Sequence, residues 1–306
     1  PFILMIPPST SSAKPIGIIG VGLVGFELAR RLIDGGKAVI GYDIKPERLI
    51  EFARIKGQVA AGVADVITAC DLLLISLPSH QEVTALLELQ AANLHSGLTI
   101  IDTTTGDPAS SEAIASSLKQ RGIDYLDATI SGSSRQVRDG SAVMMVGGDP
   151  TKFAACQDLF ALLADATFHT GANGTGAKMK LITNLVLGLN RAVFAEGLAF
   201  AEGLGFDLAL TLKIMRRSPA YSYVMDAKGE KMIEGDFTPE ARLSQHLKDV
   251  HLIVEAGLAA GLPMPLSLAH RDILEAAEAA GLGGLDNSSI IRMMSSRTTV
   301  PPAPQP

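Results

Sequence analysis

A glycine-rich turn near the start of the chain constrains the fold more than any other feature of the sequence. The segment IGIIGVGLVGFELARRLIDGG, residues 16–36, places Gly20, Gly22 and Gly25 between an apolar run and an amphipathic helical stretch. In a strand–turn–helix unit, the first glycine forms the tight turn, the second lets the backbone approach a pyrophosphate, and the third packs helix on strand. The helix N-terminus then faces the anion. The pattern predicts a dinucleotide site on a parallel sheet.

A carboxylate at the end of the second apolar run supports this prediction. Asp43 ends AVIGYD and follows the turn by about 20 residues, where an acid would bind the ribose hydroxyls. Its charge would repel the 2'-phosphate of NADP, and the next residue is Ile44 rather than an arginine that could receive that phosphate. Lys45 is the one neighbouring cation that could reach it. We therefore expect NAD, with NADP less favoured, and FAD disfavoured because the chain lacks room for another large nucleotide domain.

Short apolar runs alternate with helical stretches as far as Asp127. The strand-like runs are IGIIG, AVIGYD, DLLLISLP, LTIID and IDYLDA, with GSAVMMVGG as a further strand and FAACQDLFALLA as a further helix. This rhythm predicts an α/β fold, with an N-terminal Rossmann doubly wound sheet and crossover helices on both faces. After HTGANGTG no strand signal returns, so we expect an all-α C-terminal domain.

The chain is therefore expected to have four parts. They are a loose leader over residues 1–14, an NAD-binding Rossmann domain over 15–172, an all-helical substrate and dimerisation domain over 173–295, and a flexible tail over 296–306. The first helix of the second domain, predicted over 177–204, is apolar on several faces, which implies burial against helices of its own chain or of a partner subunit. A homodimer or homotetramer is expected.

Composition narrows the class of partner. Hydrophobic residues make up 47% of the 306 residues, and the net charge is -6, which disfavours a nucleic-acid partner. The longest apolar helical stretch is interrupted by Asn190, Arg191 and Glu196, so no membrane span is expected. The two cysteines, Cys70 and Cys156, belong to no metal or redox motif and indicate a reducing compartment. We expect a cytoplasmic protein with no metal.

Two lysines compete for a role in GTGAKMKLITN, residues 174–184. Because a helix turns by about 100° per residue, Lys178 and Lys180 lie roughly 160° apart, whereas Lys180 and Asn184 lie only about 40° apart. Only Lys180 can share a site with Asn184. The Lys178 face continues to Ile182 and is expected to pack.

Several segments, taken in order, resemble the β-hydroxyacid dehydrogenase family, the 3-hydroxyisobutyrate dehydrogenase-like enzymes. The match spans residues 15–294 and rests on the glycine turn, LP at 77–78, DTTTGDP from 102, LDATISGS from 126, GTGAKMKLITN from 174, LKD from 247 and GLGGLDNSS from 281. The resemblance implies an NAD-dependent oxidoreductase that interconverts a short 3-hydroxy carboxylic acid and its semialdehyde or 3-oxo acid. It does not single out one acid.

The resemblance also implies roles for individual residues. Those expected to bind the cofactor are Gly20, Gly22, Leu23, Val24, Gly25, Asp43, Leu77, Pro78, Thr105 and Lys248. Those expected to bind the substrate are Ser131, Gly132, Ser133 and Asn184. A serine hydroxyl and exposed backbone N–H groups suit a carboxylate. Two positions depart mildly from the family pattern, with Ser133 in place of a common glycine and Val24 in place of a usual methionine.

The catalytic lysine of the family falls on Lys180. An ammonium can give a proton to the carbonyl oxygen, and an amine can take one from the hydroxyl. Near a helix N-terminus and partly desolvated, its pKa should fall toward the working pH. Asn184 would hold a substrate oxygen through its amide. We expect Gly174 and Gly176 to let the start of the helix approach the reacting carbon without Cβ obstruction.

Alternatives remain open from the sequence. The chain would be a catalytically inactive NAD-binding sensor or scaffold if Lys180 did no chemistry. A 6-phosphogluconate dehydrogenase-like enzyme is weaker because Thr183 occupies the place of a histidine, and an imine-reductase-like enzyme typically lacks the lysine. His246 and His251 are interpreted as packing or surface groups, and Arg135 as a solvated loop residue in preference to a substrate ligand.

Overall fold

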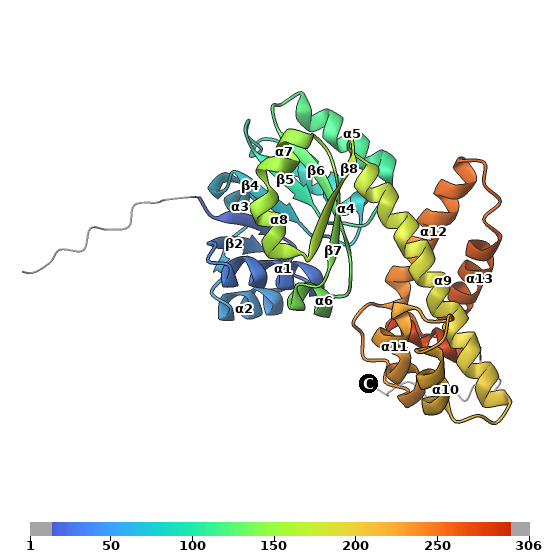
Figure 1. Ribbon diagram of the computed structural model, residues 1–306. Coiled ribbons are helices and arrows are strands. Elements are labelled where there is room, and N and C mark those ends of the chain that lie inside the picture. Colours follow the sequence, from blue (N-terminus) through green and yellow to red (C-terminus); the bar gives the residue numbers. More distant parts are fainter. Residues whose placement is uncertain (1–13, 295–306) are drawn as a thin grey trace, which may run out of the picture.

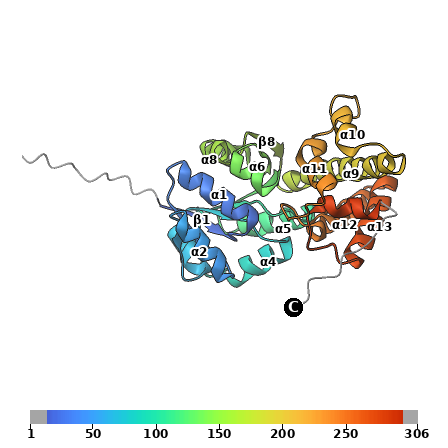
Figure 2. The ribbon, with the colours of Figure 1, turned by 90° about the horizontal axis from the view of Figure 1, so that it is seen from below.

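The computed structural model describes residues 14–294, which form an α/β lobe and a helical lobe beside one end of it (Figures 1 and 2). The predicted leader and tail lie outside the described residues, apart from Lys14, whose Nζ pairs with Asp71 Oδ1 at 2.7 Å. The expected fold class, a Rossmann-type sheet followed by helices, is confirmed.

One sheet of eight strands organises the first lobe. The strands are β1 (Ile16–Ile19), β2 (Val39–Tyr42), β3 (Gln58–Val59), β4 (Leu72–Ile75), β5 (Thr99–Asp102), β6 (Asp124–Ser131), β7 (Val143–Gly147) and β8 (Ala166–Gly171). Their order is β3-β2-β1-β4-β5-β6-β7-β8, and every neighbouring pair is parallel except the antiparallel pair β6 and β7. From β1 the chain adds β2 and β3 on one side and then returns to add β4 on the other side. This switch in strand order creates a crevice at the carboxyl ends of the strands.

Helices cover both faces of the sheet because alternate strand residues point to opposite sides. Ile18 faces the core formed with α1 (Leu23–Asp34), α2 (Pro46–Arg54), α6 (Ser134–Asp139) and α8 (Gln157–Leu163). Ile19 faces the core formed with α3 (Val63–Ala69), α4 (His80–Leu89) and α5 (Pro108–Lys119). The helix predicted over FAACQDLFALLA is two helices, because α7 (Pro150–Ala155) ends at Cys156 and α8 begins after it.

The second lobe is built around α9 (Thr175–Gly203), which runs from the sheet through the helical lobe (Figure 1). The other elements are α10 (Leu208–Met215), α11 (Tyr223–Glu234), α12 (Leu243–Ala259), α13 (Pro265–Ala279) and the 3₁₀ helix η1 (Asn287–Met293). Its core combines Phe194 and Leu198 of α9 with apolar residues such as Val250 of α12 and Leu274 of α13.

Strand β6 fixes the start of α9. The Asp127 carboxylate accepts hydrogen bonds from Gly174 N at 2.9 Å and Ala177 N at 3.0 Å. A Cβ on Gly176 would lie 2.3 Å from Asp127 O and 2.7 Å from Met145 O. We expected Gly176 to let the helix approach the reacting carbon. The structure instead shows that the missing Cβ lets the start of α9 pack closely against strands β6 and β7.

The α9 face that carries Lys178 is exposed. Lys178 Nζ pairs with Glu112 Oε1 at 2.8 Å, and Ile182 is 57% exposed. The prediction that this face packs against other helices is wrong for Lys178 and Ile182 in the single chain. By length and composition α9 could cross a membrane, although 44% of its most apolar window is buried.

Candidate active site

The glycine turn leaves space in one place only. Gly20 has a φ of +90°, and a Cβ there would lie 2.2 Å from Ser76 O. A Cβ on Gly25 would lie 1.9 Å from Gly20 O, whereas a Cβ on Gly22 would have no atom within 4 Å. Two glycines therefore close the turn against the sheet, and the open space at Gly22 fits a pyrophosphate.

Polar groups around this space also fit a dinucleotide. Helix α1 has no side-chain cap, so the first-turn N–H groups of Leu23 and Val24 are available to an anion. Asp43 lies beside the turn, where its carboxylate accepts hydrogen bonds from Val21 N and Lys45 N, both at 2.9 Å. The chain thus has an anion cradle and a carboxylate at neighbouring strand ends.

Buried polar contacts hold the loops after β4 and β5. Leu77 N donates to Thr104 Oγ1 at 3.2 Å. Asp102 is 1% exposed and accepts from Thr104 N at 2.9 Å and from Tyr125 Oη at 2.7 Å. Burial raises the pKa of Asp102. Sequence reasoning missed this support, although an acid at the end of the predicted strand LTIID was the available signal.

Lys248 joins the two lobes. From α12, its Nζ donates to Pro78 O and to Thr105 O, both at 2.8 Å. The same atom lies 3.8 Å from Asp249 Oδ1, a longer contact than either carbonyl hydrogen bond. Burial lowers the pKa of Lys248, and the Asp249 charge opposes that shift. The structure thus brings three predicted cofactor residues into direct contact.

Asp249 extends the same chain of contacts to α9. Asn184 Nδ2 donates to Asp249 Oδ2 at 2.9 Å, and both side chains are buried. Lys180 lies one helical turn before Asn184 and is 7% exposed. The contact between Asn184 and Asp249 joins α9 to α12 across 65 residues, so no local sequence pattern indicates it.

Lys180 has the environment of an acid/base group. Burial lowers its pKa to about 8, the Asp249 carboxylate raises it, and the Arg191 charge lowers it further. Among residues 14–294, none forms a hydrogen bond with Lys180 Nζ. A buried amine with a pKa near neutrality and an available nitrogen can exchange a proton with a bound oxygen.

Two serines lie at the end of β6. The Ser131 hydroxyl is available to a ligand, whereas the Ser133 hydroxyl caps a helix. Ser133 caps α6, because its Oγ accepts from Gln136 N at 3.3 Å while its N–H donates to Gln136 Oε1 at 3.0 Å. The Ser131 hydroxyl forms no hydrogen bond within the described residues, while its backbone pairs with Val143 of β7. Gly132 between them has a φ of +152°. Of the three predicted carboxylate ligands, Ser131 and Gly132 remain free to bind one.

The end of β6 runs beside the start of α9. Thr129 Oγ1 donates to Gly176 O at 2.9 Å. Ser131 lies two residues beyond Thr129, and Lys180 lies four residues beyond Gly176. These steps advance about 7 Å along the strand and about 6 Å along the helix. Ser131 and Lys180 therefore each lie within about 7 Å, measured along their own element, of the Thr129–Gly176 contact.

Other polar residues considered from the sequence lie elsewhere. His251 pairs with Glu275 at 3.5 Å and is well exposed. Arg135 is 73% exposed at its side chain and lies 3.7 Å from Asp139. His246 is buried. Within residues 14–294, there is no group of three or more His, Cys, Asp or Glu side chains that could hold a metal ion.

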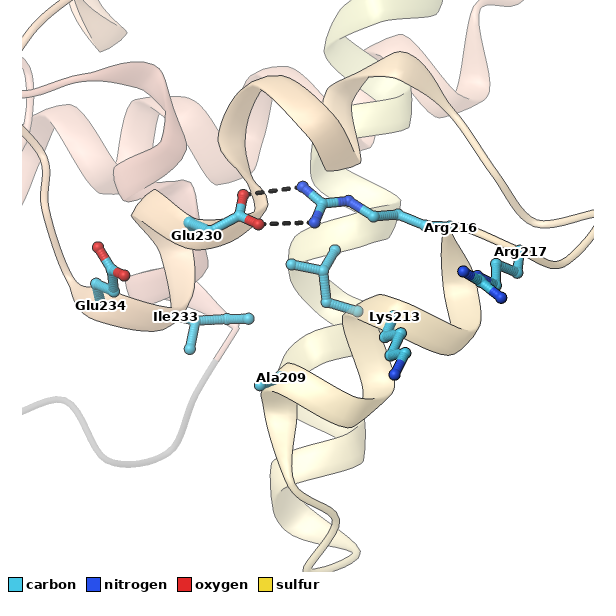
Figure 3. A pocket seen from close by; sticks show the side chains of 8 residues that line it. Ala209, Lys213, Arg216, Arg217, Glu230, Ile233 and Glu234 are labelled. Atoms are coloured by element: carbon cyan, nitrogen blue, oxygen red, sulfur yellow. Dashed lines mark hydrogen bonds and ion pairs between the residues drawn. The ribbon is translucent and has the colours of Figure 1, made fainter.

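Two cavities help to locate the functional surface. One of about 400 Å³ borders the glycine turn at Gly22 and Leu23. Another of about 360 Å³ lies between α10 and α11, where Arg216 forms two hydrogen bonds with Glu230 (Figure 3). None of the predicted site residues lines this second cavity. Of the predicted site residues, Gly22 and Leu23 line the first cavity, which Lys180 and Asn184 do not reach.

Known proteins share both halves of this arrangement. Residues 15–171 match the NAD binding domain of 6-phosphogluconate dehydrogenase, and residues 174–294 match the NAD-binding of NADP-dependent 3-hydroxyisobutyrate dehydrogenase. L-threonate dehydrogenase from Cupriavidus necator is 30% identical, over 92% of this chain and 96% of that protein. Human mitochondrial 3-hydroxyisobutyrate dehydrogenase is also 30% identical, over 95% of this chain and 90% of that protein.

A solved structure agrees. The 3-hydroxyisobutyrate dehydrogenase from Salmonella typhimurium superposes with a TM-score of 0.85 at 23% identity, covering 92% of this chain and 99% of the other. The sequence and structural matches together cover both lobes. The chain belongs to the β-hydroxyacid dehydrogenase family and is a 3-hydroxyacid dehydrogenase with a nicotinamide cofactor.

Proposed function

We propose that the protein uses NAD to interconvert a short 3-hydroxy carboxylic acid and its semialdehyde or 3-oxo acid, with Lys180 as the general acid/base. The observation that carries the proposal is the buried, available Lys180 amine, whose pKa burial lowers to about 8. It lies next to Asn184, in the contact chain that reaches Pro78 and Thr105 through Lys248.

Each residue has a distinct part in this reaction. A bound nicotinamide would supply the hydride chemistry. Lys180 Nζ takes the proton from the hydroxyl during oxidation and returns it to the carbonyl oxygen during reduction. Asn184 orients that oxygen, and Asp249 fixes the Asn184 amide. Ser131 and Gly132 bind the substrate carboxylate, while Ser133 holds the turn that presents them.

The preference for NAD rests on Asp43. Gly20, Gly22 and Gly25 would hold the pyrophosphate together with Leu23 and Val24, and Asp43 would bind the adenosine ribose. Its carboxylate disfavours a 2'-phosphate by charge repulsion. We expect kcat/KM to be higher with NAD than with NADP, and Asp43→Ala to narrow the difference. A higher kcat/KM with NADP for the wild-type protein would overturn this assignment.

The lysine pair on α9 provides a matched test of the chemistry. Lys180→Ala should lower kcat by about 10² to 10⁴, because it removes the proton-transfer group, and should leave NADH affinity within twofold. Lys178→Ala, two residues earlier and exposed, should change neither. The readouts are NADH absorbance in a screen of 3-hydroxy acids and NADH fluorescence in a titration.

The same experiment separates the rival functions. A sensor or scaffold would bind NADH with no turnover of any acid, and turnover that survives in Lys180→Ala would remove the lysine from the mechanism. An enzyme of the imine-reductase kind would reduce imines in the same assay without Lys180.

The exposed face of α9 supports a homodimer. Apolar residues recur on it at helical spacing and are 38% to 68% exposed in one chain; they are Met179, Ile182, Val186, Val193 and Phe200. A continuous apolar stripe of this length marks an interface. We take the occupant to be the same stripe of a second copy, which pairs by two-fold symmetry.

Light scattering tests the dimer. The wild-type protein should be a dimer or tetramer, and Phe200→Asp should reduce its mass by placing charge on the stripe. Leu89→Asp, at an 81% exposed position of α4, should leave the mass unchanged. A wild-type monomer that sediments with lipid vesicles would instead assign the stripe to a membrane. A cytoplasmic location belongs to the same proposal and is supported by the two free, buried cysteines.

A further inference from the structure

A buried arginine lies beyond Asn184 on the catalytic face of α9. Arg191 follows Asn184 by seven residues, two helical turns, and is 5% exposed. Its Nε and one Nη have no hydrogen-bond partner within the described residues. A guanidinium has five N–H donors and is costly to bury without a partner.

The carboxylate whose charge acts on Arg191 is already occupied. Asp286 is fully buried and lies 3.0 Å from Lys228 Nζ. The Asp286 carboxylate also accepts from the backbone N–H groups of Glu240 and Ser288. No ion pair with Arg191 occurs among residues 14–294. Within the described residues, Arg191 therefore feels the Asp286 charge without a direct ion pair.

Two histidines surround the same turn of α9. The rings of His246 and His270 lie 5.3 Å apart, on α12 and α13. A Cβ on Gly188 would lie 2.7 Å from His246 Nε2 and 2.8 Å from His270 Cε1, so only glycine lets both rings reach the helix. Both Nε2 atoms are buried and have no hydrogen-bond partner among residues 14–294. Burial lowers the pKa of each histidine, and the Arg191 charge adds to the effect.

The charges around Lys180 do not balance. Lys180 and Arg191 are cations, and the two carboxylates whose charges act on them, Asp249 and Asp286, also face Lys248 and Lys228. Both imidazoles are neutral because their pKa values are lowered. A buried excess of positive charge costs several kcal/mol. The observed set of donors would be completed by an anion, and a planar carboxylate matches the forked guanidinium best.

Building on the proposed function, we propose that Arg191, His246 and His270 form a subsite for a second carboxylate of the substrate. The first carboxylate lies at Ser131 and Gly132, the reacting carbon lies at Lys180, and the second carboxylate lies farther along α9. Arg191 follows Lys180 by eleven residues, about 16 Å along the helix, and the two long side chains shorten the distance that the substrate must bridge. The preferred substrate is then a 3-hydroxy dicarboxylic acid, longer than the three-carbon acids.

Kinetics with paired substrates test the subsite. A panel should pair 3-hydroxy monocarboxylic acids with dicarboxylic acids of the same reacting centre, at saturating NAD. We expect kcat/KM to be at least tenfold higher for the dicarboxylic member in the wild-type protein. Arg191→Met should abolish that preference, and Arg191→Lys should restore part of it. Arg271→Met, next to His270 and paired with Asp272 at the surface, should leave the preference intact.

Binding separates failure of the subsite from failure of the proposed reaction. Calorimetry with NADH present should show that glutarate binds the wild-type protein more tightly than butyrate, and that Arg191→Met loses this difference whether or not any acid is turned over. Equal binding of glutarate and butyrate by the wild-type protein would overturn the subsite. An equal kcat/KM for both members of each pair, or a stronger preference for a phosphonate in place of the second carboxylate, would also overturn it.

Discussion

Two groups of buried polar side chains, one in each lobe, are paired differently. In the α/β lobe, both oxygens of Asp102 and of Asp127 accept hydrogen bonds from the chain. In the helical lobe, Arg191, His246 and His270 retain buried nitrogens with no partner within the described residues. A satisfied carboxylate fixes backbone geometry, whereas an unsatisfied donor is poised for a ligand.

This difference depends on proximity to the site rather than on fold class. Asp286 in the helical lobe is as well satisfied as Asp127, because Lys228 and three backbone N–H groups near it bind its oxygens. These interactions overcome the effect of burial and lower the pKa of Asp286 to about 2. Two of the unpaired groups, the Nε2 atoms of His246 and His270, belong to the rings that contact Gly188, two turns along α9 from Lys180.

The largest expected effect is on the free energy of unfolding, and it distinguishes a glycine that contacts backbone, Gly25, from one beside open space, Gly22. Gly25→Ala should destabilise the fold by about 3 kcal/mol, because its Cβ would lie 1.9 Å from Gly20 O. Gly22→Ala should stay within about 0.5 kcal/mol, since nothing lies near that Cβ, and should weaken NADH binding at least tenfold. Urea unfolding followed by circular dichroism, with NADH titration, measures both. Equal losses of stability would contradict the open space at Gly22.

A smaller loss is expected where a carboxylate anchors α9. Asp127→Asn should cost about 2 kcal/mol, because a neutral amide is a poorer partner for the N–H groups of Gly174 and Ala177. Asp124→Asn is the matched control on β6, since Asp124 pairs with Lys152 at the surface and should contribute less than about 1 kcal/mol. If the two variants unfold at the same urea concentration, the Asp127 contacts do not anchor the helix.

The acid/base role of Lys180 predicts opposite pH dependences for the two reaction directions. Oxidation needs the neutral amine, so kcat/KM should rise by up to tenfold per pH unit and level off above about pH 8. Reduction needs the ammonium, so kcat/KM should be level below about pH 8 and fall above it. Arg191→Met should move both breaks to higher pH because it removes a neighbouring positive charge. Breaks of the same sense in both directions would exclude Lys180 as the titrating group.

The smallest expected effect on the free energy of unfolding is an increase rather than a loss. Arg191→Met should stabilise the ligand-free protein by about 1 kcal/mol, because an unpaired buried charge is replaced by an apolar chain of similar length. Arg271→Met should be close to neutral. Thermal unfolding without ligand is the measurement. A clear loss of stability in Arg191→Met would mean that the chain itself satisfies this arginine, and the contrast between the lobes would disappear.

The sequence by itself determined the features that depend on neighbouring residues. The glycine turn, the five main strands and the pairing of Lys180 with Asn184 follow from local spacing, because helix and strand periodicities are fixed by backbone geometry. Strands β3 and β8 were missed because their residues are largely polar or partly exposed, and their strand conformation comes from pairing with β2 and β7.

Only the tertiary structure decided which distant groups meet. Asn184 binds Asp249 across 65 residues, and Lys248 reaches Pro78 across 170 residues. Arg191 lies with His246 and His270 because three helices pack around Gly188. No local pattern specifies such contacts, since they arise from the packing of whole faces, and the same packing removes the water that would otherwise solvate these charges.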